Sequence, residues 1–371
     1  MNQQGQRGWS KSAVLGLTLL AFGLRVYDLA VQSLWVDEAY SIRLAGGDVG
    51  AILAALAASD VHPPLHYLAL HFWLGLAGSS EFAARYLSLM FSVVSVPLLF
   101  ALGRRLFGFS VALVAVALLA VSPFAVAYAQ EARMYAMVAA WCLGSLYFFA
   151  VLASDGAPAR SWWGAWIGYV LCTTLAIYTQ YYAALVVLFQ NAFLLLDWLV
   201  SPGLRRDNAE GRRAGSIGPW IAAQASVAIL FLPWLPIFLG PLGWWGNSWA
   251  AAPGVADVLQ RSWQTLNVGM AVDDRQVVPA LAGMALLFLL GLAAAGPSGL
   301  RRDARWLLFA FLGVAIPAAV LLAISQARSI FNPKFLLMEL PLYLLALAYG
   351  VSAIARRGRQ AGLLAAAVVT V

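Results

Sequence analysis

The sequence has few charged residues and almost no cysteine. Only 11% of its 371 residues are charged and 63% are hydrophobic, whereas soluble domains are about 25% charged and about 45–50% apolar. This composition excludes an ordinary soluble protein and indicates an integral membrane protein. The two cysteines, Cys142 and Cys172, lie inside apolar runs and far from any metal-ligand spacing. A disulfide framework and a cysteine metal site are therefore not expected.

The sequence also lacks any basic run with interleaved aromatic residues. Its net charge of +7 therefore does not indicate a nucleic-acid partner, since no recognisable nucleic-acid-binding module accompanies it. No internal repeat, low-complexity segment or separate soluble domain is visible. We expect one membrane domain over residues 1–371, with the lipid bilayer as its surroundings and no nucleic-acid partner.

What the sequence does have is a series of long apolar runs. A helix needs roughly 20 apolar residues to cross a bilayer, and the first run lacks the cleavage site of a signal peptide. These runs predict an all-α polytopic membrane protein with about 10–11 transmembrane helices. The last run, 361–371, is too short to span, so we expect a truncated C-terminus or a helix that only dips into the membrane. The candidate spans are 13–31, 82–102, 110–128, 132–152, 163–180, 182–200, 218–239, 277–296, 306–324 and 335–354.

The basic residues predict the orientation of these spans. With the N-terminus in the cytoplasm, 15 of the 23 Lys and Arg residues fall in short inner segments, as the positive-inside rule requires. Residues 32–81 and 240–276 then form two long outer loops. The first loop contains two short apolar stretches, 48–58 and 64–77, which we expect to be interfacial helices.

Polar side chains gather at the predicted outer ends, and the first group follows the first span. Asp37 and Glu38 are adjacent, so on a helix they point about 100° apart and should have different roles. One acid is then a general base or a group that orients the acceptor, and the other pairs with Arg43 or holds a metal. Tyr40 and Ser41 share the face of Asp37. The alternative is a pair of solvated acids at the start of an interfacial helix.

A second outer group follows the third span and contains Glu131, Arg133 and Tyr135. If all three lie on the next helix, Tyr135 shares the face of Glu131. The alternative is a Glu131–Arg133 pair at a helix end. In the first outer loop, His62 and His66 have the i, i+4 spacing that can clamp one metal ion, although a structural pair is an equal alternative.

Two basic residues, Arg328 and Lys334, lie on the predicted outer side before the last complete span. Their charges suit a lipid phosphate, and anchoring to lipid headgroups is the alternative. The loop 240–276 is rich in aromatic residues and carries scattered acids. It is interpreted either as an interfacial aromatic belt or as a sugar-binding platform.

Together these stretches resemble the membrane-embedded GT-C glycosyltransferases, in particular the bacterial protein O-mannosyltransferase and aminoarabinose transferase-like group. The resemblance covers about residues 10–200 and is thin beyond them, apart from Lys334–Leu337. The segments that carry it are Trp35–Tyr40, His62–Tyr67, Ser79–Arg85, Gly103–Gly108, Ser122–Tyr135 and Tyr178–Tyr182.

The resemblance implies a glycosyltransferase that moves a sugar from a polyprenyl-phosphate donor to a glycan, lipid or protein acceptor. It implies a bacterial inner membrane location with the active site on the periplasmic or extracellular face. Asp37 would be the catalytic acid–base residue, with Glu38 beside it and Glu131 as the second acidic position. A divalent metal ion is left open, with His62 and His66 as its ligands. The residues expected to bind substrate are Tyr40, Arg43, Arg133, Tyr135, Tyr181, Arg328 and Lys334.

Two other functions remain open on the sequence. The chain could be a non-catalytic lipid or sugar carrier, although carriers commonly show internal repeats and this sequence shows none. It could also be a catalytically incomplete relative that binds a lipid-linked sugar.

Overall fold

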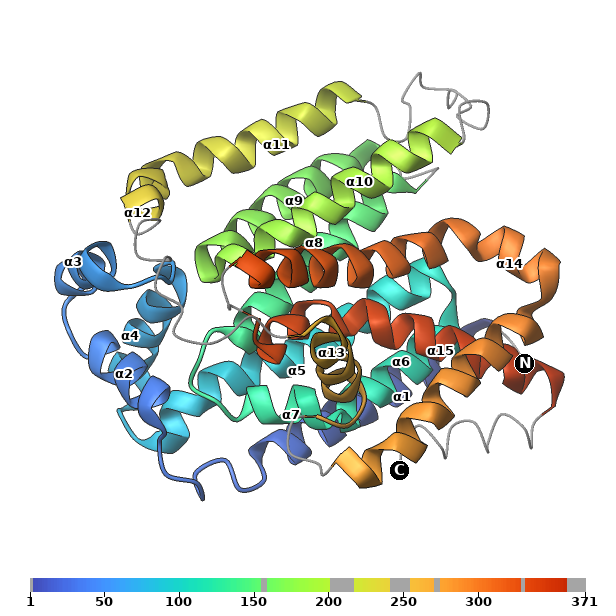
Figure 1. The fold of residues 1–371 in the computed structure, drawn as a ribbon, viewed down its shortest axis with the longest axis horizontal. Helices are drawn as coiled ribbons and strands as arrows, with labels where there is room; N and C mark the ends of the chain where they lie inside the picture. The colour runs from blue at the N-terminus through green and yellow to red at the C-terminus, as the bar shows by residue number, and fades with distance from the viewer. Residues whose placement is uncertain are drawn as a thin grey trace.

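The computed structural model describes residues 3–154, 159–200, 217–240, 254–269, 274–327 and 331–358, and in these ranges the chain is helical (Figure 1). The α-helices are α1 (Gln3–Val26), α2 (Val36–Ala45), α3 (Val49–Ser59), α4 (Leu65–Ala77), α5 (Glu81–Leu106), α6 (Phe109–Val121), α7 (Pro123–Ala129), α8 (Tyr135–Ala153), α9 (Ala159–Thr179), α10 (Ala184–Val200), α11 (Ile217–Phe231), α12 (Leu235–Leu239), α13 (Val255–Val268), α14 (Asp274–Ala327) and α15 (Leu340–Arg357). Short 3-10 turns lie at η1 (Tyr181–Ala183), η2 (Leu232–Trp234) and η4 (Pro333–Met338).

The apolar runs of the sequence coincide with these helices. Five helices of the described residues are long and apolar enough to cross a membrane, and α6 with α7 makes a sixth span if the bent pair counts as one. The remaining predicted spans also fall on helices. One of them, 277–296, lies on α14 together with the already counted span 306–324, and α14 is broken between them at Gly296, where φ is 65°. The all-α, multi-pass membrane architecture expected from the sequence is confirmed.

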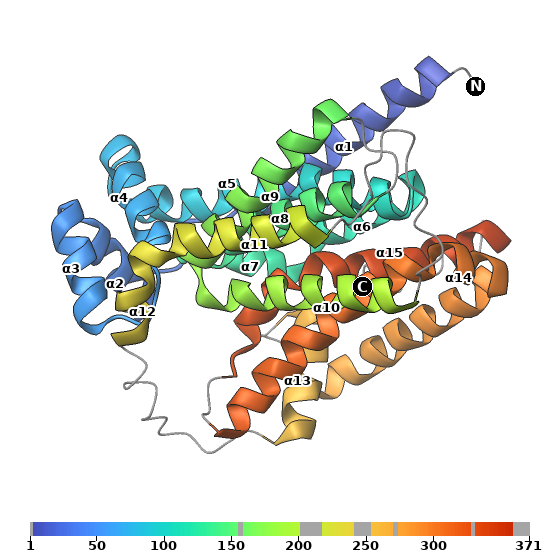
Figure 2. The same ribbon diagram turned by 90° about the horizontal axis from the view of Figure 1, so that it is seen from above.

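The centre of the bundle is built around α5 and α8. Helix α5 packs against α1, α6 and α8, and α15 packs between α6 and α14. Figure 2 shows α14 and α15 along one side of the bundle and α1 and α9 along the other. Small residues allow close helix approach in membranes. At Gly144 of α8, an added Cβ would lie only 2.8 Å from the Sγ atom of Cys172 on α9.

A sharp break separates α6 from α7 and turns the chain at this end of the bundle. Pro123 has no N–H group, so the last carbonyls of α6 lose helical partners, and the two helices meet at 56°. The buried Arg25 of α1 replaces these partners by donating to the carbonyls of Leu119 and Ala120, both at 2.9 Å. This contact fixes α7 and the turn that follows it.

Residues 32–81, which the sequence predicts to be the first outer loop, fold into three helices that gather at one end of the bundle (Figure 1). Helices α3 and α4 lie where the two short helices are predicted, and Asp48 starts α3 by accepting the N–H of Ala51 at 2.8 Å. Ile52, Leu56, Tyr67 and Trp234 form a buried apolar cluster between this loop and the end of α11. The cluster anchors α2, which carries Asp37 and Glu38.

Candidate functional site

Asp37 lies in the first turn of α2, with its carboxylate facing Arg133. The nearest Asp37 oxygen is 3.9 Å from the Arg133 guanidinium, and the Asp37 side chain is 41% exposed. Arg133 also donates to Ser41 Oγ at 2.8 Å and to the Asp37 carbonyl at 3.3 Å. The sequence therefore identified Asp37 and Arg133 as outer-end polar groups, and the structure brings them together.

Glu38 points the other way, into a buried ion pair. Arg85 of α5 donates two hydrogen bonds of 2.8 Å to its carboxylate, and the Ala132 N–H donates a third at 2.8 Å. Burial raises the pKa of Glu38, but the bonds from Arg85 and Ala132 more than offset this and hold the pKa below its usual range. Glu38 is 1% exposed. Its carboxylate therefore holds neighbouring segments together as a clamp and does not contact substrate.

This clamp joins three parts of the site. Arg85 also donates to the carbonyls of Leu29 at 3.0 Å and Gln32 at 2.7 Å, in the link between α1 and α2. Ala132 lies between Glu131 and Arg133 in the turn before α8. The buried pair thus holds α2, α5 and that turn in one arrangement, with Asp37 beside the turn.

Glu131 lies in the turn between α7 and α8, close to Lys334. Its Oε1 atom is buried and has no hydrogen-bond partner within the described part of the chain. Burial raises the pKa of Glu131 to about 7, although Lys334 and then Arg133 lower it. Lys334 Nζ lies 5.1 Å from the ring centroid of Tyr135, the first residue of α8. Lys334 therefore lies near both Glu131 and Tyr135, but Glu131 precedes α8 and does not share a helix face with Tyr135.

The raised pKa of Glu131 predicts a pH-dependent cost in stability. An ordinary glutamate has a pKa of 4.5 and the folded value is about 7, so folding favours the protonated form. Relative to acid solution, stability is lost as the pH rises from about 4.5 through 7. Glu131→Gln removes this cost. Above pH 7 its unfolding free energy should exceed that of the wild type by up to about 3 kcal/mol, which is measured as a higher melting temperature in detergent. The two proteins should converge near pH 4.5, and a pH-independent difference would contradict the buried, ionisable carboxyl.

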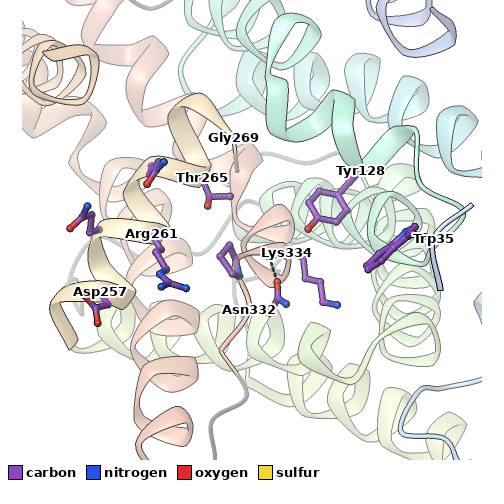
Figure 3. A pocket seen from close by; sticks show the side chains of 11 residues that line it. Trp35, Tyr128, Asp257, Arg261, Thr265, Gly269, Asn332 and Lys334 are labelled. Carbon is purple, nitrogen blue, oxygen red and sulfur yellow. Dashed lines mark hydrogen bonds between the residues drawn. The ribbon is translucent and has the colours of Figure 1, made fainter. Parts of the chain in front are cut away.

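A cavity of about 680 Å³ opens beside Lys334 (Figure 3). Trp35 and Tyr128 line one side, and the polar face of α13 lines another. Arg261 of α13 and Lys334 supply two positive charges to it. The Asn332 side chain caps η4 by accepting the Lys334 N–H at 3.2 Å, which fixes the start of the segment that carries the lysine. The cavity therefore joins an aromatic wall, a polar wall and two cations.

A separate hydrogen-bonded cluster surrounds Asp60 at the end of α3. One Asp60 oxygen lies 2.6 Å from His62 Nδ1, and the other accepts the Tyr40 hydroxyl at 2.8 Å. Burial and then the bond to Asp60 raise the pKa of Tyr40 to about 12. His62 and Tyr40 are thus tied to Asp60, while the ring of Tyr67 lies 6.5 Å from each of theirs.

The two histidines do not form the expected metal clamp. His62 precedes Pro63 and Pro64, and α4 begins only at Leu65, so the i, i+4 spacing does not place His62 and His66 on one helix face. His66 is 1% exposed, and neither of its ring nitrogens has a hydrogen-bond partner in the described ranges. Burial lowers the pKa of His66 to about 3. Across the residues that the structure describes, no three His, Cys, Asp or Glu side chains gather as metal ligands would. His62 and His66 therefore do not form a two-histidine metal site in this arrangement.

The remaining predicted substrate-binding residues that the structure describes do not line the cavity beside Lys334. Arg43, in the last turn of α2, lies over the Tyr40 ring at 5.8 Å. Tyr181 accepts a hydrogen bond of 2.8 Å from Trp234 and packs in the aromatic cluster at the end of α11. Trp263 packs edge-on against Tyr343 at 5.8 Å. Arg328, and the tryptophans 244, 245 and 249 of the second outer loop, lie outside the described residues.

Comparison with known proteins adds a sequence match and several structural ones. Residues 61–237 match the family model described as dolichyl-phosphate-mannose-protein mannosyltransferase. The structure matches ArnT from Cupriavidus metallidurans in its apo state, with 15% identity and a TM-score of 0.65, over 97% of this chain and 62% of ArnT. The chain has the GT-C fold. The resemblance seen in the sequence motifs is thereby confirmed at the level of the fold.

Two further GT-C structures carry informative ligands. ArnT bound to undecaprenyl phosphate matches with 15% identity and a TM-score of 0.59, over 98% of this chain and 63% of that protein. Archaeoglobus fulgidus AglB, in complex with an inhibitory peptide and a dolichol-phosphate, matches with 12% identity and a TM-score of 0.56, over 95% of this chain and 51% of AglB. This chain thus spans less than two thirds of either GT-C protein. A search of curated proteins found no match.

Several residues of this site were not expected from the sequence. Arg85 was overlooked as the partner of Glu38 because 47 residues separate them. Arg261 was not among the expected substrate-binding residues, although it lies in the predicted loop 240–276, one helical turn after Asp257. Asp60 was not among the expected site residues, yet its two oxygens bind both His62 and Tyr40.

Proposed function

We propose that this GT-C protein transfers a sugar from a polyprenyl-phosphate donor to an acceptor hydroxyl, with its site on the periplasmic or extracellular face of a bacterial inner membrane. The observation that carries the proposal is that Lys334, which lines a polar cavity, lies near Glu131, and that Glu131 in turn lies near Arg133 and Asp37. These residues come from three distant segments of the chain. The charge distribution of the loops supports the outer placement. The acceptor is a glycan, a lipid or a protein.

In this mechanism Asp37 acts on the acceptor. Its partly exposed carboxylate accepts a hydrogen bond from the acceptor hydroxyl and takes the proton as the hydroxyl oxygen bonds to the anomeric carbon. The bond from that carbon to the phosphate oxygen breaks with its electron pair. Polyprenyl phosphate leaves, and the sugar is joined to the acceptor. Arg133, whose guanidinium lies 3.9 Å from Asp37, orients that carboxylate.

The phosphate requires positive charge more than a proton donor, because a phosphate monoester is already a stable anion. Lys334 and Arg261 line the cavity and are the described side chains that supply this charge. Glu131 then lies between the proton-transfer group, Asp37 with Arg133, and the phosphate-binding Lys334. Glu38 and Arg85 hold these groups in place and do not touch substrate.

Binding of undecaprenyl phosphate tests the phosphate side. In lipid nanodiscs, Lys334→Met should raise the Kd of undecaprenyl phosphate at least about tenfold, because a hydrogen bond to a charged group contributes about 1.5–3 kcal/mol. Lys11→Met is the matched control, since Lys11 is exposed on α1 and is the only other lysine. An unchanged Kd for Lys334→Met, or equal losses in both variants, would remove Lys334 from the phosphate site.

A carrier function makes a different prediction for the same protein. A carrier would move a labelled polyprenyl-phosphate sugar across a vesicle membrane without forming a new glycosidic bond. A catalytically incomplete relative would bind the lipid and form no product. We expect glycosidic product from vesicles supplied with native acceptor, and transport without product would reverse the assignment.

A further inference from the structure

We propose that the cavity beside Lys334 is the sugar subsite of the donor, with Trp35 and Tyr128 stacking on the pyranose ring and the polar face of α13 reading its hydroxyls. The inference rests on the proposed function and adds the residues that determine which sugar is accepted. The ligand it predicts is an uncharged pyranose carried on a phosphate. The cavity volume, about 680 Å³, lies in the range of pockets that enclose one small ligand.

The aromatic wall is built by two residues from different elements. Trp35 precedes α2, two residues before Asp37, and is 48% exposed. Tyr128 of α7 is 4% exposed and is held by edge-on contacts with Phe124 at 5.3 Å and Tyr135 at 5.1 Å. Aromatic faces are electron-rich and attract the weakly positive C–H edge of a neighbour. A pyranose presents several C–H groups on one face, so this wall suits its ring.

The opposite wall is made of polar side chains of α13, of which Asp257 and Arg261 are charged and Gln260, Gln264 and Thr265 are neutral. Gln260 and Gln264 lie at i and i+4 on α13 and so share a helix face, and both line the cavity. Thr265, the next residue, lines it as well (Figure 3). A glutamine amide offers both donors and an acceptor, which matches hydroxyl groups that also donate and accept. Helix α13 is held against α7 and η4, so its polar face has a fixed place relative to the aromatic wall.

The charges set the direction in which a donor lies. Three charged residues line the cavity, of which Lys334 and Arg261 are positive and Asp257 is negative. Lys334 and Arg261 attract the phosphate, and the net positive charge of the lining disfavours a sugar that carries an amino cation. Lys334 also faces Glu131, and Trp35 is two residues from Asp37. A ring between the two walls is therefore bound close to both the phosphate cations and the acids. The anomeric carbon, which joins ring and phosphate, lies on this side of the cavity.

The experiment compares lipids with and without a sugar. Kd values are measured in nanodiscs for undecaprenyl phosphate, undecaprenyl-phosphate mannose and undecaprenyl-phosphate aminoarabinose, using the full chain. Gln260→Ala and Trp35→Ala should each weaken binding of the mannose lipid about fivefold, the effect of one lost contact of about 1 kcal/mol, and leave undecaprenyl phosphate unchanged. Leu259→Ala is the control, because Leu259 is 58% exposed and does not line the cavity.

Three results would overturn the subsite. The first is equal weakening of bare and sugar-loaded lipids by Trp35→Ala, which would give Trp35 a membrane-anchoring role. The second is no effect of either variant on the mannose lipid. The third is tighter binding of the aminoarabinose lipid than of the mannose lipid, which would contradict an uncharged sugar. Failure of the proposed function is distinct, because then Lys334→Met would leave every lipid's Kd unchanged.

Discussion

Asp37→Asn should lower sugar transfer by at least about 100-fold while leaving the protein folded. General base catalysis contributes about 10²–10⁴-fold, and asparagine keeps the shape of aspartate but cannot take a proton. The ion pair with Arg133 spans 3.9 Å with a 41% exposed Asp37 side chain, so its loss should cost little stability. Transfer is measured by adding purified protein to membranes of a deletion strain, which supply native donor and acceptor.

Asp48→Asn is the matched control for this substitution. Asp48 accepts the Ala51 N–H at the start of α3, and asparagine caps helices about as well as aspartate. Both variants should keep the wild-type melting temperature and bind undecaprenyl phosphate with unchanged Kd. Transfer by Asp37→Asn at the level of Asp48→Asn would show that Asp37 is not the base.

The largest loss of stability is expected when the Glu38–Arg85 pair is broken. Their side chains are 2% and 4% exposed, and removing one partner of a buried pair costs about 3–5 kcal/mol because the other charge is left uncompensated. Glu38→Gln should therefore lower the melting temperature strongly. Its transfer activity should also fall, since the same carboxylate binds the Ala132 N–H between Glu131 and Arg133.

The partly exposed ion pair between Asp197 and Arg305 provides a comparison with the buried pair. Its side chains are 13% and 34% exposed, so Asp197→Asn should cost no more than about 1 kcal/mol. The double variant Glu38→Leu with Arg85→Met should be less destabilised than the sum of its single changes, because it leaves no lone buried charge. Additive losses would contradict a direct pair.

The fold could be predicted from the sequence because membrane helices follow from local composition. Each apolar run of suitable length predicts a helix, whatever packs against it. The break at Pro123 is also local, since proline lacks the N–H that α6 would need. The partner that repairs it, Arg25, lies about a hundred residues earlier, and nothing in the local sequence indicates that contact.

Only those parts of the candidate site that follow from the local sequence could be predicted. Asp37, Glu131 and Lys334 are conspicuous as charges at outer ends, where charges are rare. The predictions that depend on helix boundaries were wrong. His62 and Glu131 each precede the helix on which the spacing rule placed them. Long-range pairs such as Glu38 with Arg85 depend on how α2 and α5 pack, which spacing does not reveal.

The most direct test of the account is mass spectrometry of envelope lipids, glycans and glycoproteins from strains that carry the wild-type or the Asp37→Asn protein at equal levels. The account predicts that the Asp37→Asn strain loses one glycosylated species and accumulates the matching polyprenyl-phosphate sugar, with its sugar still attached. Identical profiles in the two strains would contradict the claim that this chain transfers sugar from a lipid phosphate through Asp37.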